Sequence, residues 1–354
     1  MPPEDQIARG RRRLERLWRA GTALLGSELA LMGGAMTWVS EHRLVAALSN
    51  AGGFGVIACG AMAPDQLAAE IALTQELTAR PFGVNLIIMH PQLQALIDVC
   101  GAQRVSHVVL AGGLPDRAAI ARVKDGGARL LCFVPSLAVG KRLARGGADA
   151  LIIEGMEAGG HIGPVATGVL AQEILPHLRE VPVFVAGGIG HGEAIAAYLR
   201  MGAAGCQLGT RFVCATESIA HPRFKEAFIR ASARDATPSV QIDPDFKVIP
   251  VRALANQATR AFAETQIDVI ARHRRGELSY EEAGLAIEHF WAGALRRAVI
   301  DGDVEHGSLM AGQSVGLVRS VQPIAEILAE LIEQTALALG RDEWPEPTSV
   351  ETAA

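Results

Sequence analysis

The chain contains the segment Ala150-Leu151-Ile152-Ile153-Glu154-Gly155-Met156-Glu157-Ala158-Gly159-Gly160-His161-Ile162-Gly163, in which an apolar run leads into a glycine-rich loop. The apolar run predicts a buried strand. Glycine has no side chain, so the backbone of the loop can approach a planar ligand closely. Histidine is the residue type best suited to transfer a proton near neutral pH. The segment therefore predicts a strand that ends beside a bound cofactor, with His161 as an acid–base residue.

Outward from this segment, apolar runs of the same kind recur, most of them after a glycine that can close a preceding helix. Eight such runs lie at residues 28–32, 54–58, 82–86, 107–110, 129–134, 150–153, 182–186 and 205–208. Stretches with helical periodicity, such as 136–145 and 192–201, lie between them. The apolar residues within a run are continuous rather than alternating, which is typical of a parallel sheet covered on both faces.

Eight strand–helix units predict an α/β fold, a (β/α)8 TIM barrel with its active site at the carboxyl ends of the strands. A doubly wound open sheet is the alternative. Against it, the first strand lacks both a GxGxxG loop and a following ribose-binding acid at the expected distance. We expect the barrel to comprise residues 1–216 and 296–330.

The pattern changes after the eighth strand. Residues 217–295 are mostly helical in character, with long candidates at 255–273 and 280–298. We expect this region to form a helical insertion or lid on the substrate side. Residues 331–354 would form the end of a C-terminal helix and a tail, in which residues 344–348 fray.

Two loops on successive strands are suited to bind a phosphate. Residues 186–190, Ala-Gly-Gly-Ile-Gly, follow strand seven, and residues 209–212, Gly-Thr-Arg-Phe, follow strand eight. Barrels often hold a phosphate between these two loops through backbone N–H groups and a helix N-terminus. Thr210 would add a hydroxyl, and Arg211 would add positive charge or pair with a structural carboxylate instead.

Composition excludes several other classes of protein. The 354 residues are 49% hydrophobic and 20% charged, with a net charge of -5, so neither disorder nor nucleic-acid binding is expected. The three arginines at 11–13 occur at helical spacing with apolar residues and predict the solvated face of a first helix. The sequence contains no uninterrupted apolar run long enough to span a membrane and no signal-peptide core, so we expect a cytoplasmic protein. Five cysteines without a CxxC pair predict buried free thiols, and no metal-ligand motif such as HExxH is present.

Six segments together, in order, resemble the nitronate monooxygenase (2-nitropropane dioxygenase) family of FMN-dependent barrels, which includes the FMN-dependent enoyl-acyl-carrier-protein reductases. The resemblance extends from about residue 28 to 320. The matching segments are 33–36 (GGAM), 83–85 (GVN), 154–163, 186–189 (AGGI), 207–212 (QLGTRF) and 302–317, which includes MAGQSVGL.

The resemblance implies FMN as the cofactor and a role for individual residues. Gly33, Gly34 and Ala35 would lie against the isoalloxazine, and Asn85 would bind the edge of the ring. Glu154, Gly160 and Gln207 would line the flavin pocket. Gly187, Gly188, Gly209 and Thr210 would hold the phosphate. His161 would face the substrate, and Gln313 would either close the pocket or pack a helix. Structural roles remain open for three of these residues: Asn85 as a turn cap, Glu154 as a partner of a backbone N–H or arginine, and His161 as a loop histidine.

Nitronate monooxygenase activity is the reaction that we prefer from the sequence. In that reaction His161 would take the proton next to the nitro group or hold the nitronate anion, and oxygen would convert the substrate to a carbonyl compound and nitrite. Flavin or phosphate-ligand binding without catalysis is a further alternative. The expected partners are a small-molecule substrate and a second copy of the chain in a homodimer.

Reduction of an enoyl thioester is the alternative reaction. NAD(P)H would then be the reductant, acyl carrier protein would be a partner, and His161 would stabilise or protonate an enolate. Two positions differ from those reductases. They usually carry a Gly-Asn-Pro loop after strand four, where this chain has Ala111-Gly112-Gly113-Leu114-Pro115-Asp116, and Met32 stands where they commonly have Gln.

Overall fold

The fold is a closed barrel of eight parallel strands, seen in a computed structural model that describes residues 4–341. The strands are hydrogen-bonded in the order β1-β9-β8-β6-β5-β4-β3-β2. A parallel bridge joins Met32 of β1 to Phe54, just before β2, and closes the barrel. The predicted (β/α)8 barrel is therefore confirmed. The strand bounds are β1 Leu31–Gly33, β2 Val56–Ala58, β3 Gly83–Ile87, β4 His107–Ala111, β5 Arg129–Phe133, β6 Ala150–Glu154, β8 Val183–Ala186 and β9 Gly205–Leu208.

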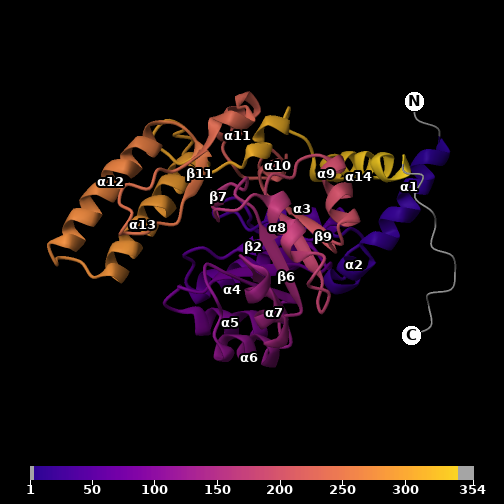
Figure 1. Ribbon diagram of the computed structural model, residues 1–354, viewed down its shortest axis with the longest axis horizontal. Helices are drawn as coiled ribbons and strands as arrows, with labels where there is room; N and C mark the ends of the chain where they lie inside the picture. The colour runs from indigo at the N-terminus through magenta and orange to yellow at the C-terminus, as the bar shows by residue number, and fades with distance from the viewer. Residues whose placement is uncertain (1–3, 342–354) are drawn as a thin grey trace.

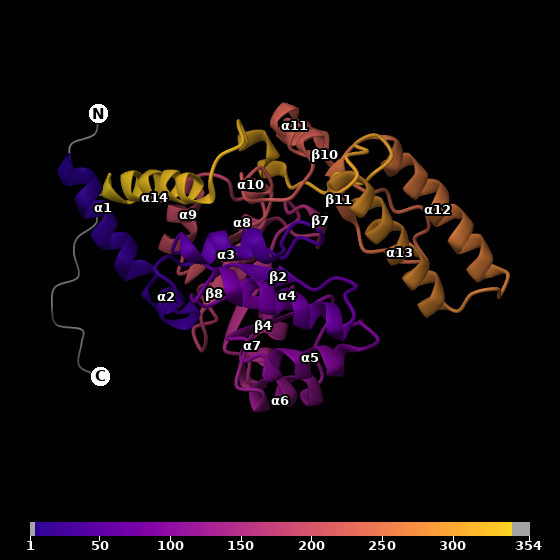
Figure 2. The ribbon, with the colours of Figure 1, turned by 180° about the vertical axis from the view of Figure 1, so that it is seen from behind.

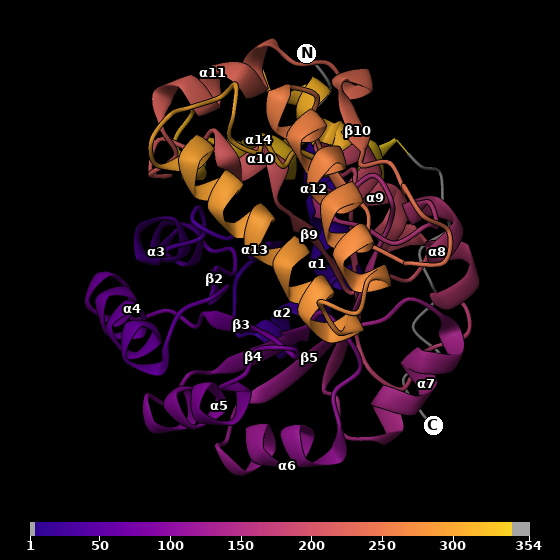
Figure 3. The same cartoon turned by 90° about the vertical axis from the view of Figure 1, so that its left-hand side faces the viewer.

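A ring of helices covers the outside of the barrel (Figure 3). These helices are α3 His42–Asn50, α4 Pro64–Leu77, α5 Leu93–Ala102, α6 Arg117–Asp125, α7 Leu137–Arg145, α8 Thr167–Ile174 and α9 Gly192–Arg200. Local signals set their ends: the Asp116 carboxylate accepts from the N–H of Ala119 at the start of α6. Gly127 and Gly147, after α6 and α7, have φ values of +81° and +108°, which favour glycine and turn the chain into the next strand.

The first strand lies later in the chain than predicted. It was expected at residues 28–32, and it spans Leu31–Gly33. Glu28 instead lies in a bend before the strand and forms a surface ion pair with Arg80 at 3.0 Å.

A long excursion follows β9 and contains both helices and strands. A three-stranded antiparallel sheet, β10-β11-β7, joins the excursion to the loop after β6. The sequence did not predict β10 and β11, which have only three and four residues. The elements are α10 Thr210–Val213, α11 Pro222–Arg230, the 3-10 turn η1 Ala233–Asp235, β10 Ala236–Pro238, β11 Val251–Leu254, α12 Gln257–Arg274 and α13 Tyr280–Val299, with β7 at Gly160–His161.

Helices α12 and α13 form a hairpin that projects from the barrel (Figure 1). The hairpin has its own core, in which Phe262, Ile287 and Trp291 are buried. The two helices match the predicted stretches 255–273 and 280–298 closely. Helix α13 also runs through residues 295 and 296, where we had expected the insertion to end and the barrel to resume.

The terminal helices pack together at the end of the molecule opposite the hairpin (Figures 1 and 2). They are α1 Glu4–Leu17, which continues into α2 Arg19–Leu25, and α14 Ile324–Gly340, which follows the 3-10 turn η2 Gln313–Leu317. The predicted solvation of the three arginines is wrong for Arg13, which is buried. Its Nη1 donates to the carbonyl of Leu339 at 2.9 Å because α1 crosses α14 at this point.

The remaining sequence expectations concern the thiols, the membrane and the tail. All five cysteines are free and buried, as predicted. No helix within residues 4–341 has the length and apolar character needed to cross a bilayer. Residues 344–348, expected to fray, lie outside the described residues.

Candidate active site

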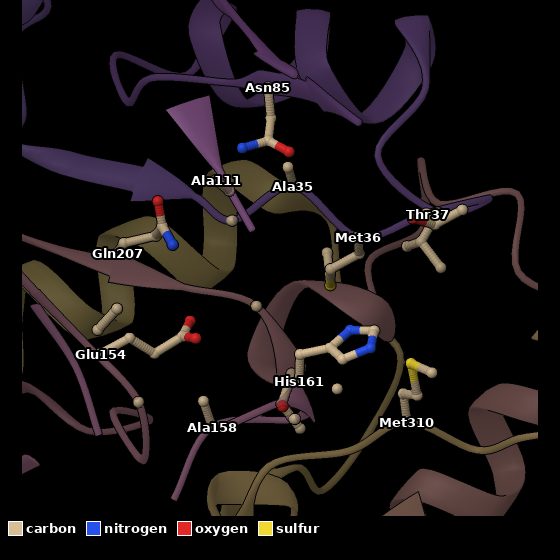
Figure 4. Close-up of a pocket in the computed structure, with 18 of the residues that line it drawn as sticks. Ala35, Met36, Thr37, Asn85, Ala111, Glu154, Ala158, His161, Gln207 and Met310 are labelled. Atoms are coloured by element: carbon tan, nitrogen blue, oxygen red, sulfur yellow. The ribbon is translucent and has the colours of Figure 1, made fainter. Parts of the chain in front are cut away.

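A cavity of about 390 Å³ opens at the carboxyl ends of the barrel strands (Figure 4). This size is within the range of small-molecule and cofactor sites. The barrel brings together residues that are far apart in the chain, and almost every predicted site residue lines the cavity: Gly34, Ala35, Asn85, Glu154, Gly160, His161, Gly187, Gly188, Gln207, Gly209 and Thr210.

Gly33 is the one predicted cofactor-binding residue that does not line the cavity. It belongs to β1 and faces the helix layer instead. A Cβ built at Gly33 would lie 2.4 Å from Cδ1 of Leu48 in α3. Gly33 therefore lets α3 pack closely on the strand, whereas Gly34, the next residue, reaches the cavity.

Three polar side chains enter the cavity from three different strands (Figure 4). Asn85 comes from β3, Glu154 from β6 and Gln207 from β9. The Asn85 amide nitrogen donates a long hydrogen bond of 3.4 Å to the carbonyl of Val109. Within the described residues, the Asn85 amide oxygen and the polar atoms of Glu154 and Gln207 have no hydrogen-bond partner. These polar atoms face the cavity and are therefore available to a ligand that has several ring heteroatoms.

Burial raises the pKa of Glu154 to about 7, and the nearby His161 partly opposes this effect. The carboxyl group is removed from water at the end of β6, which disfavours its charged form. A carboxyl group with this pKa can hold or release a proton near neutral pH. The sequence predicted only that Glu154 lines the pocket. The structure adds that its carboxyl group can titrate near neutral pH.

One end of the cavity is lined by the two predicted phosphate loops. Gly188 and Ile189 follow β8, and their backbone N–H groups donate to no other group in the described part of the chain. The N–H of Gly209, after β9, is also free of a partner within residues 4–341. Free N–H groups on two adjacent glycine loops are donors of the kind that can bind an anion.

Arg211 does not line the cavity. Its Nη2 atom donates to Glu330 at 2.8 Å and to Gln322 at 2.9 Å, and only 4% of its side chain is exposed. Of the two roles left open by the sequence, pairing with a structural carboxylate is the observed one. The positive charge ties the loop after β9 to helix α14.

His161 lies at the mouth of the cavity on the short strand β7. Its backbone pairs with Val251 of β11, and its imidazole extends into the cavity between Met36 and Met310 (Figure 4). The imidazole Nε2 lies 3.1 Å from Oε1 of Glu288, which belongs to α13. The cavity mouth therefore combines one residue from the barrel loop with one from the hairpin.

Glu157 and two glycines support the loop that carries His161. The Glu157 carboxylate accepts from the N–H and the hydroxyl of Thr167, at 2.9 and 2.8 Å, and so caps α8. A Cβ built at Gly159 would lie 2.5 Å from the backbone nitrogen of Gly312, so these two backbones are in direct contact. Gln313 donates its N–H to the carbonyl of Glu157 at 2.9 Å, so it fixes the same loop through its backbone.

Another part of the cavity lining is apolar, and most of it was not predicted from the sequence. These side chains come from the ends of β3 and β5, from loops and from the excursion, and nothing in the local pattern places them near His161. They are Met36, Ile87, Met89, Phe133, Ile249, Leu295 and Met310.

One group of potential metal ligands occurs within residues 4–341, and it consists of Glu41, His42 and Glu70. None of the three lines the cavity. The Glu41 carboxylate accepts from the N–H of Leu44 and so caps α3. This cluster therefore has a structural role at the start of that helix.

The fold and the site define a (β/α)8-barrel enzyme with a cofactor-sized cavity and a histidine at its mouth. A family model described as nitronate monooxygenase matches residues 20–100 and 92–334. The chain belongs to the nitronate monooxygenase family and is an oxidoreductase.

Relatives of known name fall into two groups. A protein of Mycobacterium tuberculosis named (3aS,4S,5R,7aS)-5-hydroxy-7a-methyl-1-oxo-octahydro-1H-indene-4-carboxyl-CoA dehydrogenase is 30% identical over 88% of this chain and 94% of its own length. A nitronate monooxygenase of Paraburkholderia phytofirmans is 29% identical over the same shares of the two chains.

Two solved structures share the fold. FabK from Thermotoga maritima is 36% identical, with a TM-score of 0.79 over 89% of this chain and 94% of its own. Nitroalkane oxidase from Streptomyces ansochromogenes is 27% identical, with a TM-score of 0.73 over 89% of this chain and 98% of its own.

Proposed function

We propose that this protein is an FMN-dependent oxidoreductase that reduces the double bond of an enoyl thioester, with NAD(P)H as the reductant. The observation that carries the proposal is the charge of the cavity lining. No arginine or lysine is present among the described residues that line it, and its titratable side chains are Glu154, Glu288 and His161. A neutral acyl group suits this lining better than an anionic nitronate does, which reverses our preference from the sequence.

The residues of the cavity fit FMN. Asn85, Glu154 and Gln207 offer unpaired polar atoms to a heteroaromatic ring, and the loops at 188–189 and 209–210 offer N–H groups to a phosphate. When bound, FMN would supply the transfer of hydride between NAD(P)H and the substrate.

The apolar side chains at the mouth support an acyl substrate. Met89 and Ile249 line the cavity and are 55% and 48% exposed, so they offer apolar surface at its entrance. An acyl chain would bury this surface, at about 25 cal/mol for each Å² removed from water. The name of the M. tuberculosis relative also points to a thioester, since that protein is called a carboxyl-CoA dehydrogenase.

His161 would act on the carbon next to the thioester carbonyl. Hydride addition at the β-carbon leaves an enolate, and the His161 imidazolium would stabilise that charge and give its proton to the α-carbon. The product is a saturated thioester, and NAD(P)+ is released. General acid catalysis of this kind contributes roughly 10²–10⁴-fold to the rate.

Nitronate monooxygenase activity is the second candidate. The nitronate monooxygenase of P. phytofirmans and the nitroalkane oxidase structure favour it, at 29% and 27% identity. In that reaction His161 would take the proton next to the nitro group.

Two assays on one preparation separate the candidates. Under anaerobic conditions, crotonyl-coenzyme A and NAD(P)H should yield butyryl-coenzyme A and NAD(P)+. In air, propyl-2-nitronate should release nitrite slowly or not at all. Rapid nitrite release without thioester reduction would reject the proposal and support the monooxygenase.

A further inference from the structure

We propose that Glu288, on the projecting hairpin, is a positioning residue that holds the imidazole of His161 in one tautomer. The inference rests on the proposed function, because it assigns Glu288 to the proton-transfer step of that reaction. It adds a residue from the excursion to a site otherwise built by the barrel.

The geometry supports a directed hydrogen bond. His161 Nε2 and Glu288 Oε1 are 3.1 Å apart, and the two residues are separated by 127 positions in the chain. Because a carboxylate oxygen can only accept, the Nε2 atom must carry the proton. In the neutral imidazole, Nδ1 then has a free lone pair. When the ring becomes an imidazolium, Nδ1 carries the added proton, and this proton would pass to the substrate.

The pair contributes little to the stability of the fold. The side chains of His161 and Glu288 are 42% and 36% exposed, and ion pairs at this exposure are weak in water. Both residues nevertheless line the cavity. A weak contact at the mouth of an active site is better explained by orientation of the histidine than by support of the hairpin.

Other contacts hold α13 in place, so Glu288 is not needed for that purpose. The Trp38 indole N–H donates to the carbonyl of Ala292 at 3.3 Å, and the Arg296 guanidinium lies 5.9 Å from the centre of the Trp38 ring. Backbone pairing of β7 with β11 fixes the main chain of His161 independently of Glu288. Removal of the carboxylate should therefore release the imidazole without moving either backbone.

Three variants test the assignment. Glu288→Ala removes the acceptor, Glu288→Gln keeps an acceptor oxygen without the charge, and Glu281→Ala is the control. Glu281 is an exposed carboxylate in the first turn of the same helix, and it makes no ion pair within the described residues.

The first readout is the tautomer of His161, measured by NMR on the purified FMN-containing protein labelled with ¹⁵N-histidine. The His161 signals are assigned by their loss in His161→Asn. We expect a proton on Nε2 in wild type, Glu281→Ala and Glu288→Gln, and a mixture of tautomers in Glu288→Ala. An unchanged tautomer in Glu288→Ala would overturn the inference.

The second readout is a double-mutant cycle on reoxidation of the reduced enzyme by crotonyl-coenzyme A. Glu288→Ala should slow this step by about 10- to 100-fold, Glu288→Gln should recover part of the loss, and reduction by NAD(P)H should not change. In the His161→Asn background, Glu288→Ala should add no more than about a twofold effect, because its target is absent. An equal loss in both backgrounds would overturn the inference. If wild type does not react with crotonyl-coenzyme A, the proposed function fails, and the NMR readout still tests the pairing.

Discussion

The hydroxyl of Thr210 accepts a hydrogen bond of 2.9 Å from the backbone N–H of Gly312, 102 positions later in the chain. This contact connects the glycine loop after β9 to the segment that precedes η2. Within residues 4–341 the hydroxyl proton of Thr210 has no acceptor, so it is free to bind the phosphate of the proposed FMN.

Thr210→Val should lower the affinity for FMN. Valine keeps the shape of the side chain but loses both the acceptor for Gly312 and the donor to phosphate. A lost hydrogen bond to a charged group corresponds to about 1.5–3 kcal/mol, or roughly a 10- to 150-fold higher Kd. Fluorescence titration of apoprotein with FMN measures this change, and Thr210→Ser should bind nearly as wild type. Equal affinity of the valine variant would show that the hydroxyl does not contact the phosphate.

Glu154→Gln should alter how the stability of the apoprotein depends on pH. Burial raises the pKa of Glu154 from 4.5 to about 7, so the folded state holds a proton that the unfolded state releases. The wild type therefore loses stability as pH rises from about 4.5 to 7, by at most about 3 kcal/mol. The glutamine variant should lack this loss. Urea unfolding at pH 5 and pH 8 measures the free energy of unfolding of both proteins. An equal change between the two pH values in wild type and variant would contradict the assignment.

His161→Asn should leave FMN bound and remove most of the catalytic rate. The side chain stands at the mouth of the cavity and is 42% exposed, so cofactor affinity should change little. Loss of the proton donor should slow thioester reduction by roughly 10²–10⁴-fold. The flavin absorbance of the purified variant and its single-turnover rate check the two parts separately. Turnover at the wild-type rate would remove His161 from the mechanism.

Gly159→Ala should destabilise the loop that carries His161. The added Cβ would meet the backbone nitrogen of Gly312 at 2.5 Å, and backbone cannot move aside as a flexible side chain can. Overpacking of this kind costs about 1–3 kcal/mol. Gly163→Ala is the matched control, because a Cβ there has nothing within 4 Å. Thermal unfolding should show a lower Tm for the first variant only; equal values would mean that the loop adapts freely.

The barrel and the cofactor end of the site could be predicted from the sequence because their signals are local. Each parallel strand is a continuous apolar run, and the glycine loops directly follow their strands. Because all the strands are parallel, these loops lie together at the carboxyl ends of the strands. Gly33 shows the limit of this reasoning. Gly33 faces the helix layer and its neighbour Gly34 reaches the cavity, and a family motif does not resolve a difference of one position.

The substrate side could not be predicted, because it depends on long-range contacts. Glu288 lies on an amphipathic helix like many others, and only its 3.1 Å contact with His161 shows that this helix reaches the cavity. Arg13 is a similar case. A run of arginines predicts a solvated helix face, but the packing of α14 across α1 buries Arg13. Neither contact leaves a signal in the spacing of nearby residues.

The most direct test of the proposed function is the absorbance spectrum of the purified protein under anaerobic conditions. We expect a yellow protein whose visible flavin absorbance is bleached by NAD(P)H. The band should return when crotonyl-coenzyme A is added. A colourless protein, or a band that NAD(P)H leaves unchanged and propyl-2-nitronate bleaches, would contradict the proposal.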